Sequence, residues 1–123
     1  LFTLTVEHGV KPRNASYIYT ILPGATPEET AGTPPGRVLR NTPECQAVEF
    51  ADGVRAAIFY EPGRLDDFET DTPGAFLIGK GMVHAADPTG RHSSFTLKLN
   101  GVSRKVPLPA GEFAGQSVKI VLK

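Results

Sequence analysis

The sequence predicts an all-β protein, an antiparallel β-sandwich preceded by a β-hairpin. Apolar and polar residues alternate over short stretches such as residues 94–99, as expected for strands with one buried face. The 123 residues include 13 Gly and 11 Pro, and this excess over average usage indicates many turns and few long helices. After Gly36 a turn signal bounds each short apolar stretch, which is typical of an antiparallel sandwich.

Residues 1–36 predict a hairpin, a short helix and a linker. Residues 1–6 alternate in polarity, residues 17–22 are rich in aromatic and β-branched side chains, and the turn residues between them make a hairpin with a long loop. Residues 26–30 carry a helix start, since the threonine can cap, the proline suits the first helical position and the two glutamates complement the positive end. Residues 33–36 (TPPG) predict a domain boundary.

Residues 37–123 predict the sandwich itself. Turn signals at Asp52-Gly53, residues 87–90 and Asn100-Gly101 separate its strands, whereas residues 65–72 are polar and acidic. We expect roughly eight short strands, at residues 37–40, 46–50, 54–60, 75–78, 82–86, 94–99, 102–108 and 118–122.

Composition narrows the function classes. The 13 basic and 13 acidic residues give zero formal charge, which argues against a nucleic-acid or membrane-surface partner because both are recognised through a basic surface. Cys45 is the only cysteine, which excludes an internal disulfide and a multi-cysteine zinc site. No apolar run approaches the ~20 residues of a membrane span. We expect no metal and no cofactor, and we expect the chain to be a piece of something longer, because it begins in the middle of a strand pattern without an initiator Met.

The candidate acid–base residues are few. His8, His84 and His92 lack the spacing of a helical metal site. Tyr17 and Tyr19 share one strand face, and with His8 they could form an acid–base pair, which needs a tyrosine of lowered pKa. We favour the simpler interpretation, in which both tyrosines cover a sheet face and the histidines hydrogen-bond within turns.

The other candidate motifs also favour structural interpretations. The acidic run 66–71 lacks the pattern of an EF-hand calcium loop, Ser94 lacks a nucleophile elbow, and Gly79-Lys80-Gly81 turns the chain between strands. Cys45 is expected to pack as a small apolar side chain. Asn14-Ala15-Ser16 matches the N-glycosylation acceptor pattern, which matters only in a eukaryotic secretory setting. No residue is assigned a catalytic, cofactor-binding or metal-binding role.

Carbohydrate binding is the second function that the residues suggest. The chain has no tryptophan, the ring that stacks best on sugars, so the remaining candidates are Tyr17, Tyr19, Tyr60 and Phe113. A local cationic cluster could contact a polyanion through Arg91, His92, Arg104 and Lys105.

Residues 8–26 (HGVKPRNASYIYTILPGAT) resemble the HG-x-x-P-x-x-x-x-Y-x-Y-x-x-x-P stretch of polysaccharide lyase family 8, which includes hyaluronate, chondroitin and xanthan lyases. The resemblance continues in order through residues 38–48, 59–63, 86–90 and 108–118. It implies an enzyme that cleaves uronic-acid-containing polysaccharides by β-elimination, with catalytic groups on an α/α-toroid and in the early central sandwich. Neither region lies in this chain, so no catalytic residue is carried over.

By this resemblance, residues 1–36 are the end of the central β-sandwich and residues 37–123 are the C-terminal β-sandwich domain of a secreted or periplasmic bacterial lyase. The implied role is non-catalytic support of the catalytic cleft by packing on the central sandwich, with the polysaccharide met only through the parent enzyme. Two alternatives stay open: a free-standing carbohydrate-binding module, and a small enzyme using the Tyr/His set.

Overall fold

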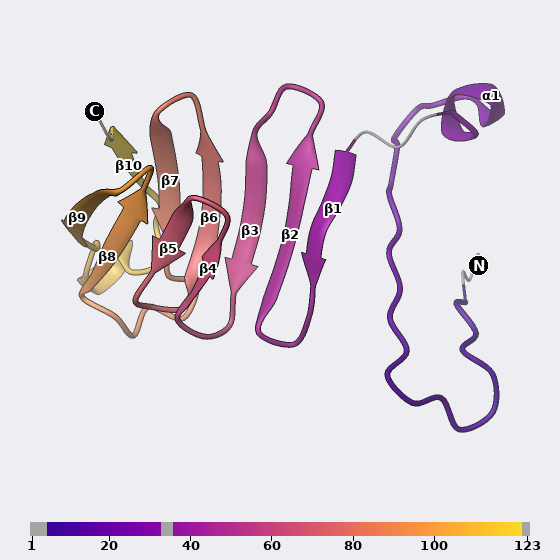
Figure 1. The fold of residues 1–123 in the computed structure, drawn as a ribbon, viewed down its shortest axis with the longest axis horizontal. Coiled ribbons are helices and arrows are strands. Elements are labelled where there is room, and N and C mark those ends of the chain that lie inside the picture. The colour runs from indigo at the N-terminus through magenta and orange to yellow at the C-terminus, as the bar shows by residue number, and fades with distance from the viewer. Residues whose placement is uncertain (1–4, 33–35, 122–123) are drawn as a thin grey trace. The chain divides into compact units, whose positions relative to one another are not determined.

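The computed structural model describes residues 5–32 and 36–121. The chain divides into two compact units, Leu1–Pro34 and Pro35–Lys123. Figure 1 shows the course of the chain through both units.

The first unit contains one short helix, α1 (Pro27–Thr30), which begins at the predicted place. Thr26 caps it in a reciprocal arrangement. The Glu29 backbone N–H donates to Thr26 Oγ1 at 3.2 Å, and the Thr26 N–H donates to Glu29 Oε2 at 2.8 Å. Two backbone donors that the first turn leaves without helical partners are satisfied in this way.

The predicted hairpin is wrong as a hydrogen-bonded pair within the described residues. Residues 5–22 run without strand pairing, and residues 1–4, which carry the start of its first strand, lie outside the described residues. The apolar side chains of this stretch are solvent-exposed, with Ile21 at 73% and Val10 at 94%. A two-stranded ribbon is marginal in water without a further layer against its apolar face, and these 28 residues supply no such layer. The predicted linker at residues 33–35 also lies outside the described residues.

The second unit is an antiparallel two-sheet structure, in agreement with the predicted fold class (Figure 1). The six-stranded sheet has the order β1-β2-β3-β6-β7-β10, and the four-stranded sheet has the order β4-β5-β8-β9. The strands of the first sheet are β1 (Gly36–Asn41), β2 (Cys45–Phe50), β3 (Arg55–Phe59), β6 (Gly74–Gly79), β7 (Met82–Ala86) and β10 (Val118–Val121). Those of the second are β4 (Gly63–Leu65), β5 (Phe68–Thr70), β8 (Ser94–Leu99) and β9 (Val102–Pro107), and a 3-10 turn, η1 (Gly111–Phe113), precedes β10.

All eight stretches expected to be strands contain one, and the described structure adds two more. Strands β4 and β5 lie around the acidic stretch that the sequence did not predict as sheet. Their inward positions are Leu65, Phe68 and Thr70, each at most 2% exposed, so three buried side chains suffice to place this polar stretch in a sheet. The β6–β7 and β8–β9 hairpins turn through Lys80-Gly81 and Asn100-Gly101, and all four of these residues have positive φ, as tight two-residue turns require.

Four phenylalanine rings join the two sheets at the centre of the core. Phe59 and Phe76 come from the six-stranded sheet, and Phe68 and Phe95 from the four-stranded sheet; none is more than 3% exposed. The ring centroids of Phe68 and Phe76 are 5.0 Å apart, and those of Phe76 and Phe95 are 5.3 Å apart. Tilted ring contacts at this distance stabilise the fold beyond the contribution of burying the rings.

Gly74 permits this close packing at the start of β6. A Cβ atom built there would lie 2.9 Å from both the Ala86 carbonyl oxygen and Phe95 Cζ. No side chain fits without moving the neighbouring strand or the ring, so glycine is required here by space.

We expect Phe68→Ala to lower the free energy of unfolding by about 3–5 kcal/mol, because it removes the ring that contacts both Phe59 and Phe76 and leaves a cavity. Urea denaturation of the chain measures the change. Phe50→Ala is the matched control, since Phe50 is 41% exposed, and we expect it to change stability by less than ~1 kcal/mol. Equal effects of the two substitutions would contradict this description of the core.

Candidate functional site

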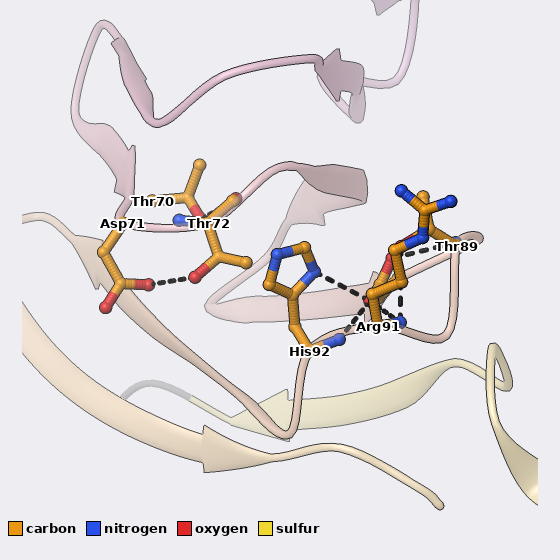
Figure 2. A network of polar contacts seen from close by, with 7 residues as sticks. Thr70, Asp71, Thr72, Thr89, Arg91 and His92 are labelled. Atoms are coloured by element: carbon orange, nitrogen blue, oxygen red, sulfur yellow. Dashed lines mark hydrogen bonds and ion pairs between the residues drawn. The ribbon is translucent and has the colours of Figure 1, made fainter.

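The densest polar network lies in the loop between β7 and β8, and Figure 2 shows it from close by. Its centre is Asp87, whose side chain is only 3% exposed. Oδ1 accepts from the backbone N–H of Thr89 at 2.8 Å and from its hydroxyl at 2.6 Å. Oδ2 accepts from the backbone N–H groups of Arg91 at 2.9 Å and His92 at 2.8 Å, and lies 2.9 Å from His92 Nδ1. One carboxylate therefore holds the whole loop.

These contacts decide the charge state of Asp87. Burial by itself raises the pKa of a carboxyl group, but the hydrogen bonds from Thr89 and His92 outweigh it, so the pKa of Asp87 is held well below its usual range. The Asp87 carboxylate is charged at neutral pH, and it is the acceptor in each of its hydrogen bonds in this loop.

A second carboxylate, Asp71, plays a similar part just after β5. Its Oδ1 accepts from the Thr72 hydroxyl at 2.7 Å and from the Thr96 backbone N–H at 2.7 Å. Burial works to raise the pKa of Asp71, and the bonds from Thr96 and Thr72 lower it further than burial raises it. Thr70 supports the same segment, because its hydroxyl donates to the Thr72 carbonyl at 2.8 Å.

His92 is the group of this network that could take part in chemistry. Its side chain is 39% exposed and contacts the Asp87 carboxylate through Nδ1. Because the carboxylate only accepts, the ring proton of neutral His92 belongs on Nδ1, which leaves Nε2 as an acceptor. An aspartate-oriented histidine is two-thirds of a catalytic triad. Among the described residues no side chain donates a hydrogen bond to Nε2, so the third member of a triad is not found there. The other hydrogen bonds of Asp87 all come from residues of its own loop.

The other prominent feature is a hollow on the outer face of the six-stranded sheet. Its volume is about 460 Å³. Most of the residues that line it are apolar, Phe76 among them, and the polar ones are Gln46, His84 and Ser117. The main apolar contributors are Val48, Ala56, Ile58, Ala75, Leu77 and Ala86.

The structure places the predicted candidates as follows. His8 and Tyr17 lie together with ring centroids 6.0 Å apart, and Tyr17 stacks on Tyr19 at 6.1 Å. The two tyrosines are 60% and 63% exposed, so within this chain they do not cover a buried sheet face. His84 lines the hollow, whereas His92 contacts Asp87 and His8 contacts Tyr17.

Two carboxylates of the acidic run lie close to the guanidinium of Arg55. Asp67 accepts from Arg55 Nη1 at 2.6 Å, and Asp66 lies 3.8 Å from the same guanidinium. This ion pair ties β3 in one sheet to the β4–β5 turn of the other. Among residues 5–32 and 36–121, no group of three metal-ligating side chains converges.

Two members of the predicted cationic cluster make hydrogen bonds within the fold. His92 is bound to Asp87, and Arg104 Nη1 donates to the Val121 carbonyl at 2.9 Å. Cys45 is 2% exposed, and burial raises the pKa of its thiol, although nearby Arg40 acts in the opposite direction. Within the part of the chain that the structure describes, no helix is long and apolar enough to cross a membrane.

Sequence reasoning missed two features. It identified residues 87–90 as a turn without seeing that Asp87 anchors it, although aspartate opening a turn followed by Pro, Thr and Gly is a usual signal for such capping. It also missed the apolar outer face. The signal was the continuous apolar run at residues 56–60, because a strand that is apolar on both faces is usually covered on both faces.

Comparison with known proteins decides the family. Residues 37–96 match the model of the polysaccharide lyase family 8, C-terminal beta-sandwich domain. Chondroitinase-AC of Pedobacter heparinus is 39% identical over 140 aligned positions, which cover 98% of this chain and 20% of the relative. Hyaluronate lyase of Thermasporomyces composti is 36% identical, with 80% of this chain and 14% of the relative covered.

The chain belongs to polysaccharide lyase family 8. A third relative, hyaluronate lyase HylB of Enterococcus faecalis, is 32% identical over 79% of this chain and 11% of its own length. The chain thus spans about a fifth or less of these lyases. The part matched by the family 8 model includes β1 to β7, the Asp87 loop and the beginning of β8.

We expect Asp87→Asn to lower the free energy of unfolding by about 2–4 kcal/mol at pH 7, because an amide cannot accept all the bonds that the carboxylate accepts. The pKa of Asp87 is depressed in the folded state. Its contribution is therefore complete above the unfolded pKa of about 3.9 and is lost as the pH falls through the lower folded value.

The measurement is urea denaturation of both proteins between pH 7 and pH 3. We expect the difference between wild-type and Asp87→Asn to shrink as the pH falls below about 4. A difference that stays constant from pH 7 down to pH 3 would show that the carboxylate charge does not hold this loop.

Proposed function

We propose that this chain is the non-catalytic C-terminal β-sandwich part of a polysaccharide lyase that cleaves uronic-acid-containing polysaccharides, of the hyaluronan, chondroitin or xanthan type, by β-elimination. The match of residues 37–96 to the C-terminal domain of family 8 carries this proposal. The names of the relatives support the substrate class, since they are a chondroitinase and two hyaluronate lyases.

The use of the ionisable groups supports a role without catalysis. β-Elimination needs a base at the C5 proton and a group that neutralises the uronate charge, placed within hydrogen-bond reach of one sugar. Here Asp87 and His92 hold a loop, Arg55 holds Asp67, and Asp71 holds the segment before β6. These side chains are engaged in separate structural contacts, and they do not converge on one point.

The same contacts suit a domain that supports an adjoining catalytic cleft. Catalytic groups lose much of their rate advantage when displaced by about 1 Å, so a rigid neighbour is useful. In this interpretation residues 1–36 end the central sandwich, residues 37–123 pack on it, and the parent enzyme acts on polysaccharide outside the cytoplasm of a bacterium, as a secreted or periplasmic protein.

We expect the isolated chain to produce no unsaturated sugar from hyaluronan, chondroitin or xanthan, while the full-length parent produces it from at least one of them. The ultraviolet absorbance of the new carbon–carbon double bond is the measurement. Turnover by the isolated chain would overturn the non-catalytic role, and a parent that cleaves none of the three would overturn the substrate class.

One observation favours the alternative of a carbohydrate-binding module. Tyr17 and Tyr19 stack at 6.1 Å and are both more than half exposed, and exposed aromatic rings are what sugar faces bind. Calorimetric titration of the chain with the same three polysaccharides distinguishes the two functions. Heats that saturate, and that vanish in the Tyr17→Ala variant, would favour the binding module, and a flat titration favours support.

A further inference from the structure

We propose that the end of the sandwich formed by the β7–β8 loop and η1 is a secondary contact site for uronate polysaccharide. In this site the Arg91 guanidinium pairs with a uronate carboxylate and the Phe113 ring packs against a sugar face. The inference rests on the proposed function, because the substrate class comes from it.

Two contacts place the loop and η1 side by side. The Leu108 backbone N–H donates to the Ser93 carbonyl at 2.9 Å, which continues the pairing of β8 with β9. A Cβ atom built on Gly90 would lie 3.3 Å from Ala114 Cβ. Phe113 directly precedes Ala114, so its ring belongs to the same end of the sandwich as the loop.

The Arg91 side chain is free to bind a ligand. Its backbone N–H donates to the Asp87 carboxylate at 2.9 Å, which holds the residue in place at the base of the loop (Figure 2). Its side chain is exposed, and among the described residues no hydrogen bond or ion pair engages its guanidinium. Arg55 and Arg104 differ, because their guanidinium groups bind Asp67 and a backbone carbonyl. A guanidinium matches the two oxygens of a carboxylate.

The neighbouring side chains supply the other contacts that a sugar needs. Phe113 is 52% exposed, and an aromatic ring can pack on the apolar face of a sugar. His92 is 39% exposed and is held by Asp87 through Nδ1, so Nε2 is available to accept from a sugar hydroxyl (Figure 2). The site therefore combines a cation, a ring and a hydrogen-bond acceptor.

The charge balance favours a uronate polymer over a nucleic acid. Glu112 lies on η1 and is exposed, so Arg91 is accompanied by an acidic group. Nucleic acid binding depends on several cations that meet successive phosphates, whereas a uronate polymer combines carboxylates with apolar ring faces and hydroxyl groups. One ion pair and one ring contact give weak affinity, with a dissociation constant on the order of 1 mM.

Such a weak contact becomes useful in the parent enzyme. A long polymer that occupies the catalytic cleft and this site together binds more tightly than either site alone allows, because the second contact is then intramolecular. A short oligosaccharide cannot reach both sites. At millimolar affinity the heats of a calorimetric titration do not saturate, so the chain itself has to be studied by a method suited to weak binding.

NMR titration of the isotope-labelled chain tests the site directly. The probes are short oligosaccharides of hyaluronan and chondroitin, with dextran of similar length as the polymer without uronate. We expect the uronate oligosaccharides, and not dextran, to shift the amide signals of residues 87–92 and 111–115. This mapping uses the unaltered chain and so does not depend on the folding of any variant.

Variants then assign the contacts. We expect Arg91→Gln to weaken binding about ten-fold, since it removes a charged hydrogen-bond donor pair, and Phe113→Ala to weaken it about three-fold. Glu112→Gln should tighten binding about two-fold, because it removes a like charge from the site.

Matched controls lie at the other end of the sandwich. Lys80→Gln removes one exposed cation from the β6–β7 turn, which precedes β7, whereas the Asp87 loop follows it. Phe50→Ala removes a ring that is 41% exposed. We expect both controls to bind as the wild-type chain does.

Kinetics of the full-length parent give a second measurement. We expect Arg91→Gln to lower the ratio of kcat/KM for long polymer to kcat/KM for a tetrasaccharide about three-fold, and Lys80→Gln to keep the wild-type ratio. A role of Arg91 in folding alone would lower both values together and leave the ratio as it is.

Several results would overturn the proposal. They are amide shifts confined to Tyr17 and Tyr19, equal shifts with dextran, and equal affinities of Arg91→Gln and Lys80→Gln. A parent that cleaves its polysaccharide while the chain shows no shift in these segments keeps the proposed function and loses this inference alone. A parent that cleaves no uronate polymer loses the proposed function, and the titration still reports whether the site binds.

Discussion

Burial of four phenylalanine rings between two antiparallel sheets is the interaction on which the rest of this structure depends. Phe68 contacts both Phe59 and Phe76, and Phe76 passes the contact on to Phe95, so the rings form one connected group across the two layers. Because Gly74 has no side chain, the Phe95 ring can approach β6 closely. Once this core forms, the strand registers and therefore the positions of the loops at both ends of the sandwich are determined.

The polar groups then secure the loops that the core leaves at its ends. Asp87 holds the β7–β8 loop through five contacts, and Arg55 joins the two sheets through Asp67. Charged hydrogen bonds of this kind restrict a loop more strongly than neutral ones. These contacts restrain the loops, which fits the proposal that the domain supports a neighbouring catalytic region.

Much of the sandwich could be predicted from the sequence because its strands alternate clearly and its turns carry Gly, Asn and Asp. The family resemblance was confirmed by the comparisons. Strands β4 and β5 were missed because only Leu65 and Phe68 are apolar in a stretch of charges, and their pairing depends on contacts from β8. The N-terminal hairpin was expected from the patterns of residues 1–6 and 17–22, but strand pairing there needs a layer that residues 5–32 do not contain. The anchoring role of Asp87 was also missed, since it depends on N–H groups that converge only in the folded loop.

The central claim is that this domain contributes stability to a larger lyase and no reacting group. Thermal unfolding and steady-state kinetics of the full-length enzyme, with and without residues 37–123, test it most directly. We expect loss of the domain to lower the melting temperature, because the contacts that it makes are removed, while kcat measured well below that temperature stays within a few-fold of the intact enzyme. Unchanged melting together with abolished activity would contradict the claim.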